Sequence, residues 1–165
     1  GTPINHAPEL EPNVESIVVH IDIDGEAILL GSDLENHATL GWSAVISDRW
    51  ASSRQAATAY KVAHHGSYSG DVPAIWTSFL RDDPVVCLTP FNLGSVKLPS
   101  DSDKERIRKA TPHRYITSGA TRRPDMDNTQ LNLRPTNNGF GAVRMRKRIG
   151  DASWQVECFG NAQSL

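Results

Sequence analysis

The stretch ATAYKVAHHGSYSG, residues 57–70, contains both a strand and the residues best suited to chemistry. Residues 57–63 are short and apolar, and they predict a strand that ends directly at His64 and His65. Gly66 and Ser67 follow at once. Because a rigid strand fixes the loop after it, we interpret two imidazoles at this place as candidates for metal binding or acid–base chemistry.

A second strand end carries a carboxylate. Residues 16–24 (SIVVHIDID) alternate with period two, and the Asp24-Gly25 turn predicts a hairpin with residues 26–33 (EAILLGSD). This returning strand presents Asp33 at its tip. Carboxylate and imidazole both suit a cation such as zinc. A helix cap at Asp33 and two ordinary loop histidines are the alternative interpretation.

The other segments predict one α/β domain over residues 1–165. Residues 1–14 are expected to form an extended lead-in, and strand and helix patterns alternate after them. We expect helices over 37–48, 71–80 and 100–110, capped by Asn36, Asp71 and Ser100, strands over 84–90 and 113–118, a long loop over 119–138 and a closing hairpin around Gly150-Asp151.

Composition excludes several classes of protein. The formal net charge is −2 and 38% of the residues are hydrophobic, so no overall positive field attracts nucleic acid. No apolar run is long enough for a membrane span, and we expect a cytoplasmic protein. Cys87 and Cys158 are predicted to be buried free thiols. The local run RMRKR, residues 144–148, predicts a solvated strand face, with phosphate binding as the alternative.

The two strand-end motifs together resemble a known family. Residues 13–35 (NVESIVVHIDIDGEAILLGSDLE) and 60–70 (YKVAHHGSYSG) are similar to the second half of a metallo-β-lactamase-fold hydrolase, in particular the hydrolase domain of ComEC-type DNA-uptake proteins and their stand-alone relatives. The closing hairpin with Trp154 also resembles theirs. The resemblance implies the C-terminal half of an αββα sandwich, with a mixed sheet, covering helices and a terminal β-hairpin.

The resemblance also implies a site. Asp33 would bridge two divalent metal ions, zinc with manganese as the alternative, and His64 more than His65 would bind the second ion. His65 would then face the substrate and assist catalysis, and Ser67 would hydrogen-bond the ligand imidazole. The chain would be part of a binuclear zinc-dependent hydrolase of the phosphodiesterase or nuclease kind, with nucleic acid as one possible substrate.

One family motif has no match here. His-x-His-x-Asp-His belongs to the first half of the fold, whereas His6, His20, His37 and His113 stand alone. We therefore expect the N-terminal half to come from an upstream segment or a separate chain, and the start at Gly1 without a methionine to mark a piece of a longer protein. A non-catalytic binding or assembly module that reuses the half-fold is the alternative, and another ester or a lactam is a third substrate class.

Overall fold

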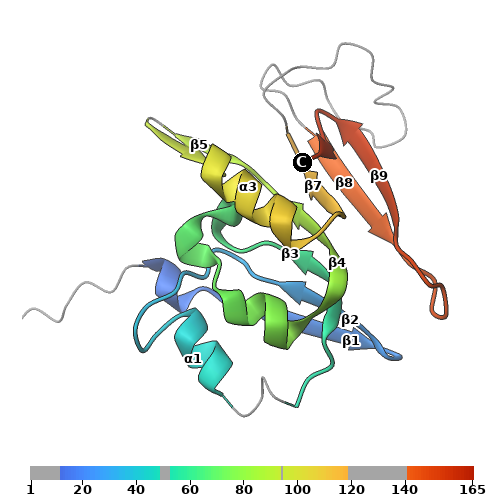
Figure 1. The fold of residues 1–165 in the computed structure, drawn as a ribbon, viewed down its shortest axis with the longest axis horizontal. Helices are drawn as coiled ribbons and strands as arrows, with labels where there is room; N and C mark the ends of the chain where they lie inside the picture. The colour runs from blue at the N-terminus through green and yellow to red at the C-terminus, as the bar shows by residue number, and fades with distance from the viewer. Residues whose placement is uncertain (1–11, 49–52, 94, 119–140) are drawn as a thin grey trace, which may run out of the picture.

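The computed structural model describes residues 12–48, 53–93, 95–118 and 141–165 and is built around one twisted sheet (Figure 1). The sheet has six strands in the order β1-β2-β3-β4-β7-β10. These strands are β1 (Val19–Ile23), β2 (Glu26–Leu30), β3 (Ala57–Lys61), β4 (Leu80–Leu88), β7 (Arg114–Ile116) and β10 (Gln163–Ser164).

The four central strands, β2, β3, β4 and β7, are parallel, and β1 and β10 join the two edges antiparallel. The carboxyl ends of parallel strands meet at the same edge of a sheet, which is where ligands bind in open α/β sheets. The loops after β2 and β3 therefore lie side by side. The mixed sheet and α/β class agree with the sequence prediction.

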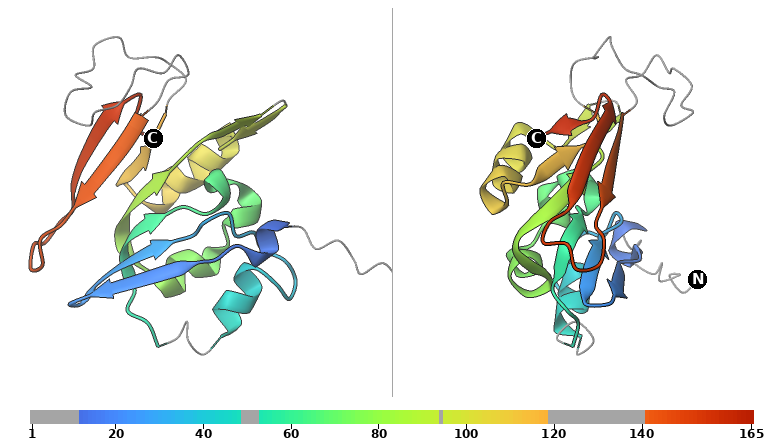
Figure 2. Two further views of the ribbon diagram at one scale, coloured as in Figure 1. Left: turned by 180° about the vertical axis from the view of Figure 1, so that it is seen from behind. Right: turned by 90° about the vertical axis from the view of Figure 1, so that its right-hand side faces the viewer.

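Helices cover one face of the sheet (Figures 1 and 2). Leu29, Tyr60 and Val86 stand in register on β2, β3 and β4, and all three are fully buried. The Tyr60 ring packs edge-on against Trp76, with centroids 6.0 Å apart. The covering elements are α1 (Trp42–Ser47), the π-helical turn η4 (Ile75–Phe79) and α3 (Asp101–Ala110).

Short elements complete the structure. Two small antiparallel pairs stand outside the main sheet, β5–β6 and the terminal hairpin β8–β9. The terminal hairpin is as predicted. The bounds are η1 (Pro12–Glu15), η2 (His64–Gly66), η3 (Tyr68–Gly70), β5 (Phe91–Leu93), β6 (Val96–Leu98), β8 (Gly141–Arg146) and β9 (Gln155–Gly160).

The opposite face of β1 and β2 carries apolar side chains in contact with solvent. Val19 and Leu30 stand opposite each other, and both are exposed, as are Ile17 before β1 and Ile23 at its end. The left view of Figure 2 shows this face from behind, with β1 and β2 in front of the helices. We call Ile17, Val19 and Leu30 the open patch; Leu30 ends β2, so the patch adjoins the loop that carries Asp33.

Two predicted helices differ from the structure. Helix α1 begins only at Trp42, because Asn36 forms a bridge with Gly41, whose φ of 62° precedes the helix. The predicted helix 71–80 is short, and Leu80 already belongs to β4. Asp71 does not cap it; its carboxylate accepts hydrogen bonds from Trp76 and Arg106. Helix α3 has the predicted cap, a reciprocal pair between Ser100 and Asp103.

Other predictions are corrected in detail. Cys87 and Cys158 are free, as predicted, but partly exposed instead of buried. Residues 12–15 form a 3-10 turn, whereas residues 1–11 of the lead-in lie outside the described residues. The predicted long loop over residues 119–138 also lies outside the described residues. Among the described helices, none is long and apolar enough to cross a membrane.

Candidate metal site at the strand ends

Backbone hydrogen bonds join the loops that follow β2 and β3. The Gly31 N–H donates to the Lys61 carbonyl and the His64 N–H donates to the Ser32 carbonyl, both at 3.0 Å. A Cβ at Gly31 would lie 2.8 Å from the Cβ of Ala63, so only glycine permits this approach. Asp33 and the histidine pair are thereby fixed next to each other.

The turn that carries the histidines has an unusual backbone. His64, His65 and Gly66 have φ values of 42°, 55° and 80°, all in the left-handed region. This region is unfavourable for residues with a Cβ, so the surrounding structure must hold the turn in place. The Gly66 carbonyl accepts a hydrogen bond of 2.7 Å from Arg106 of α3, and the Ser67 N–H closes the turn onto the His64 carbonyl.

Arg106 is itself held by two carboxylates. Its Nε lies 2.6 Å from Asp71 and its NH1 2.7 Å from Asp103, and both acidic side chains are nearly inaccessible to solvent. Burial lowers the pKa of Arg106, but the hydrogen bonds that it donates to Asp71 and Asp103 outweigh this effect and raise the pKa above its ordinary value. The guanidinium therefore stays charged and ties the histidine turn to α3.

Asp33 and His65 face each other at the mouth of the site. The Asp33 Oδ1 lies 3.5 Å from His65 Nε2, while His65 Nδ1 lies 2.9 Å from the Thr89 carbonyl. A carbonyl only accepts, so the Thr89 contact places a proton on Nδ1, and Nε2 is the ring nitrogen that faces the carboxylate. At this distance either a proton on Nε2 or a metal ion would join the imidazole to the carboxylate.

The separation fits a shared metal ion. Zinc binds imidazole nitrogen and carboxylate oxygen at about 2.0–2.2 Å with tetrahedral geometry, which places two ligand atoms roughly 3.4 Å apart. The distance of 3.5 Å between Asp33 and His65 agrees with this value. Phe91 packs against the His65 ring at 5.2 Å between centroids and restricts its rotation.

His64 has a carboxylate partner of its own. Its Nδ1 lies 2.7 Å from Glu35 Oε1 and 2.8 Å from Ser67 Oγ, and its Nε2 lies 3.2 Å from the Asn13 amide nitrogen. An Nδ1 proton donated to Glu35 leaves Nε2 as an acceptor for the Asn13 amide. A carboxylate that orients an imidazole in this way commonly accompanies metal-binding histidines. The Ser67 hydrogen bond to His64 is the contact that the resemblance implied.

The structure thus gathers all the predicted site residues at one sheet edge, but it pairs Asp33 with His65 and not with His64. Which histidine binds metal stays a prediction.

Sequence reasoning missed Glu35 and Asn13. Glu35 lies two residues after Asp33 in the same strand-end loop, and this spacing was its signal. The remaining described histidines stand apart: His37 and His113 are exposed, and His20 Nε2 is 2.8 Å from the Gln55 carbonyl.

Lys61 adds an amine at the same edge. It ends β3, and its Nζ donates to the Val62 carbonyl at 3.0 Å. Burial lowers the pKa of Lys61, and the nearby Cys87 and Asp33 offset this only in part.

Within the described residues, no group of three or more His, Cys, Asp or Glu side chains is arranged to hold a metal ion. Asp33 and His65 therefore form a pair of donor side chains and no complete set of metal ligands.

Comparison of the chain with models of known protein families, with curated proteins and with solved structures finds no match. The geometry at the strand ends must carry the functional argument.

Proposed function

We propose that this chain supplies part of the site of a binuclear, zinc-dependent phosphodiester hydrolase of the metallo-β-lactamase type. The observation that carries the proposal is the distance of 3.5 Å between Asp33 Oδ1 and His65 Nε2, at the ends of two adjacent parallel strands. His64, oriented by Glu35, lies beside this pair, with 6.1 Å between the two imidazole centroids. The substrate class rests on the sequence resemblance alone.

Each residue has a role in the proposal. Asp33 and His65 would hold one divalent ion, and His64, whose Nε2 now contacts the Asn13 amide, would hold the second. Bound zinc would supply a hydroxide near neutral pH and stabilise phosphate oxygens. In this arrangement Arg106 acts as a positioning residue, because it fixes the turn of His64 and His65 without reaching the substrate.

The proposed enzyme needs a second component. A catalytic zinc ion has three protein ligands and an open position, and Asp33 with His65 supplies two donors. The missing donors would come from an N-terminal half with the His-x-His-x-Asp-His motif. The open patch of Ile17, Val19 and Leu30 adjoins the site and gives that half an apolar surface to pack on.

Zinc binding by the chain alone tests the donor pair. Titration calorimetry should show weak binding, and Asp33→Asn or His65→Gln should each weaken it about tenfold or more, because one of two donors is lost. His37→Gln, which changes an exposed histidine four residues after Asp33, is the matched control and should leave the affinity unchanged. In the complete assembly, Asp33→Ala should abolish metal-dependent phosphodiesterase activity. Unchanged turnover would contradict the proposal.

The second candidate function is a non-catalytic binding or assembly module. It is favoured by the small number of donors: the described residues contain no complete metal-binding group. Metal analysis of the complete assembly separates the two functions. About two zinc ions per chain would support the hydrolase, and none would support the module.

A further inference from the structure

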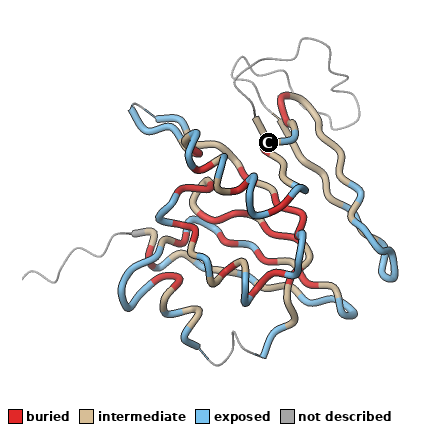
Figure 3. The backbone as a smooth tube through the Cα atoms, in the orientation of Figure 1, coloured by how far each residue is buried: buried red, intermediate tan, exposed pale blue. Residues whose placement is uncertain are grey.

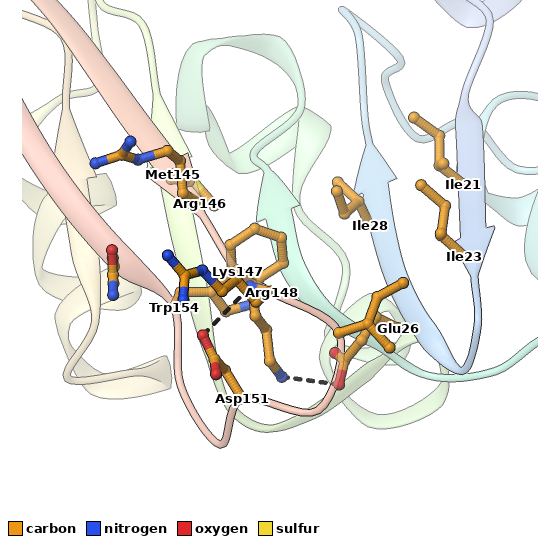
Figure 4. A pocket seen from close by; sticks show the side chains of 12 residues that line it. Ile21, Ile23, Glu26, Ile28, Met145, Arg146, Lys147, Arg148, Asp151 and Trp154 are labelled. Atoms are coloured by element: carbon orange, nitrogen blue, oxygen red, sulfur yellow. Dashed lines mark hydrogen bonds and ion pairs between the residues drawn. The ribbon is translucent and has the colours of Figure 1, made fainter.

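A second cleft lies at the other end of the sheet, away from Asp33. It opens between β1–β2 and the terminal hairpin β8–β9 and has a volume of about 530 Å³ (Figure 4). Glu26 at the start of β2 belongs to it, whereas Asp33 follows the end of that strand. This volume is within the range of about 300–1,000 Å³ typical of small-molecule sites.

The two walls of the cleft are joined by polar contacts. Lys147 reaches from the hairpin to Glu26 with a distance of 2.8 Å, and its side chain is only 7% exposed. The Trp154 indole N–H donates to Thr58 Oγ1 at 3.1 Å. Figure 4 shows Lys147 crossing the cleft to the sheet. These contacts set the separation of hairpin and sheet.

The inner surface of the cleft is apolar. Ile21, Ile23 and Ile28 form the side made by the sheet, and Met145 and Trp154 face them from the hairpin (Figure 4). Ile23 is 54% exposed, so a bound apolar group would remove this side chain from water. Release of such surface from water is the main driving force for binding an apolar body.

The lining of the cleft carries charges of both signs. The lining contains the cations Arg146, Lys147 and Arg148 together with the carboxylates Glu26 and Asp151. Lys147 is neutralised by Glu26, and Arg146 is 2.9 Å from Glu157 on β9. Within the described part of the chain, the Arg148 guanidinium has no ion-pair partner, although its backbone N–H contacts Asp151. Arg148 is therefore the cation available to an incoming anion.

We propose that this cleft binds a small amphipathic anion, an aliphatic carboxylate whose tail lies on the isoleucines and whose head group meets Arg148. No residue that lines the cleft belongs to the loops that carry Asp33 and His65, although the cleft opens on the same sheet face as the open patch. A planar guanidinium also matches the geometry of a carboxylate.

Decanoate and decanol, which differ in the charge of the head group, test the proposal with the full chain. Calorimetry or amide NMR shifts should show saturable binding of decanoate at one site, at least tenfold tighter than decanol. Arg148→Gln should weaken decanoate binding about tenfold and leave decanol unchanged. Arg108→Gln, an exposed arginine on α3, is the matched control and should change neither affinity.

A second variant tests the contact between the aliphatic tail of the ligand and the isoleucines of the cleft. Ile23→Asp places a charge on the apolar side of the cleft at an exposed position, where folding tolerates it, and should abolish decanoate binding. Absence of saturable binding, or equal affinities for decanoate and decanol in the unaltered protein, would overturn the proposal. Those wild-type measurements decide the matter even if a variant fails to fold. Asp33→Asn should not affect decanoate binding, and this keeps the test apart from that of the metal site.

Discussion

The histidine turn shows how single residues permit a strained conformation. His64 and His65 occupy left-handed backbone angles that cost free energy, and their neighbours contain glycines placed where a side chain would clash. Gly70 packs directly under His64, and a Cβ built there would lie 2.6 Å from the His64 Cβ. The orientation of the imidazole toward Glu35 depends on this close contact.

Gly70→Ala should therefore destabilise the protein. Gly70 has no positive φ. If the space around it were free, alanine would therefore stabilise the protein by about 0.4–1 kcal/mol, because it reduces the conformational freedom of the unfolded chain. The clash with His64 reverses the sign, and we expect a loss of about 1–3 kcal/mol of unfolding free energy in urea titrations. NMR signals of the His64 imidazole should shift as well.

Gly150→Ala is the control for this substitution. No atom lies within 4 Å of a Cβ at Gly150, so only its φ of +90° opposes the methyl group. That variant should lose some stability but leave the His64 signals in place. If Gly70→Ala also left them unchanged, the packing of Gly70 would not position His64.

At this scale, sequence reasoning found the site residues but not their partners. Asp33, His64 and His65 are visible because they follow apolar strands directly. The pairing of Asp33 with His65 was not predictable, because it depends on the left-handed turn that directs the two imidazoles to different carboxylates. Alternation along a strand cannot report a turn of this kind.

Among the elements, α3 connects the sheet to the site. Its first turn contains the reciprocal Ser100–Asp103 cap, and Arg106 one turn later holds Gly66. Burial raises the pKa of Asp103, but hydrogen bonds from Ser100 and Arg106 outweigh it and keep the pKa below its usual value of 3.8. The cap and the histidine turn are thus stabilised by the same ionised carboxylate.

Acid should weaken this arrangement. A carboxyl group whose pKa is lower in the folded state stabilises the protein above its unfolded-state pKa, and the contribution is lost as pH falls through the folded value. Urea unfolding at pH 7, 5 and 3 should show a decline below about pH 4. Asp103→Asn should reduce stability at pH 7 and flatten that decline.

Asp101→Asn is the comparison in the same helical turn. The pKa of Asp101 is also lowered, first by its hydrogen bond to Lys104, but its side chain is 99% exposed and solvent screens the pair. This variant should keep nearly all of the acid-dependent decline. Equal flattening by both substitutions would show that the buried cap is not its source.

The elements themselves were largely predictable, for identifiable reasons. α3 was found because its cap and charge order follow helix rules. α1 was placed too early, because Asn36 uses its backbone in a bridge to Gly41 and its side chain to accept from Ser43. The β5–β6 pair was missed, since its strands have three residues each and show no clear alternation.

At the scale of the whole molecule, the hairpin β8–β9 is a second sheet attached to the main one by few contacts. Lys147 with Glu26 and Trp154 with Thr58 link the hairpin to strands β2 and β3. The hydrogen bond to Lys147 is the main cause of the lowered pKa of Glu26. Loss of this link should loosen the hairpin without unfolding the main sheet.

Lys147→Met tests this hierarchy, because methionine keeps the buried stem and removes the charge. A hydrogen bond between charged groups contributes about 1.5–3 kcal/mol, so amide hydrogen exchange in β8 and β9 should accelerate about tenfold or more, while β2 and β3 stay protected. Lys104→Met removes an ion pair of the same 2.8 Å length, but Lys104 is 31% exposed and its partner Asp101 is fully in solvent. It should leave hairpin exchange unchanged. Equal acceleration in β2, β3 and the hairpin would mean that the two sheets open as one unit, and the cleft between them would then be as stable as the core.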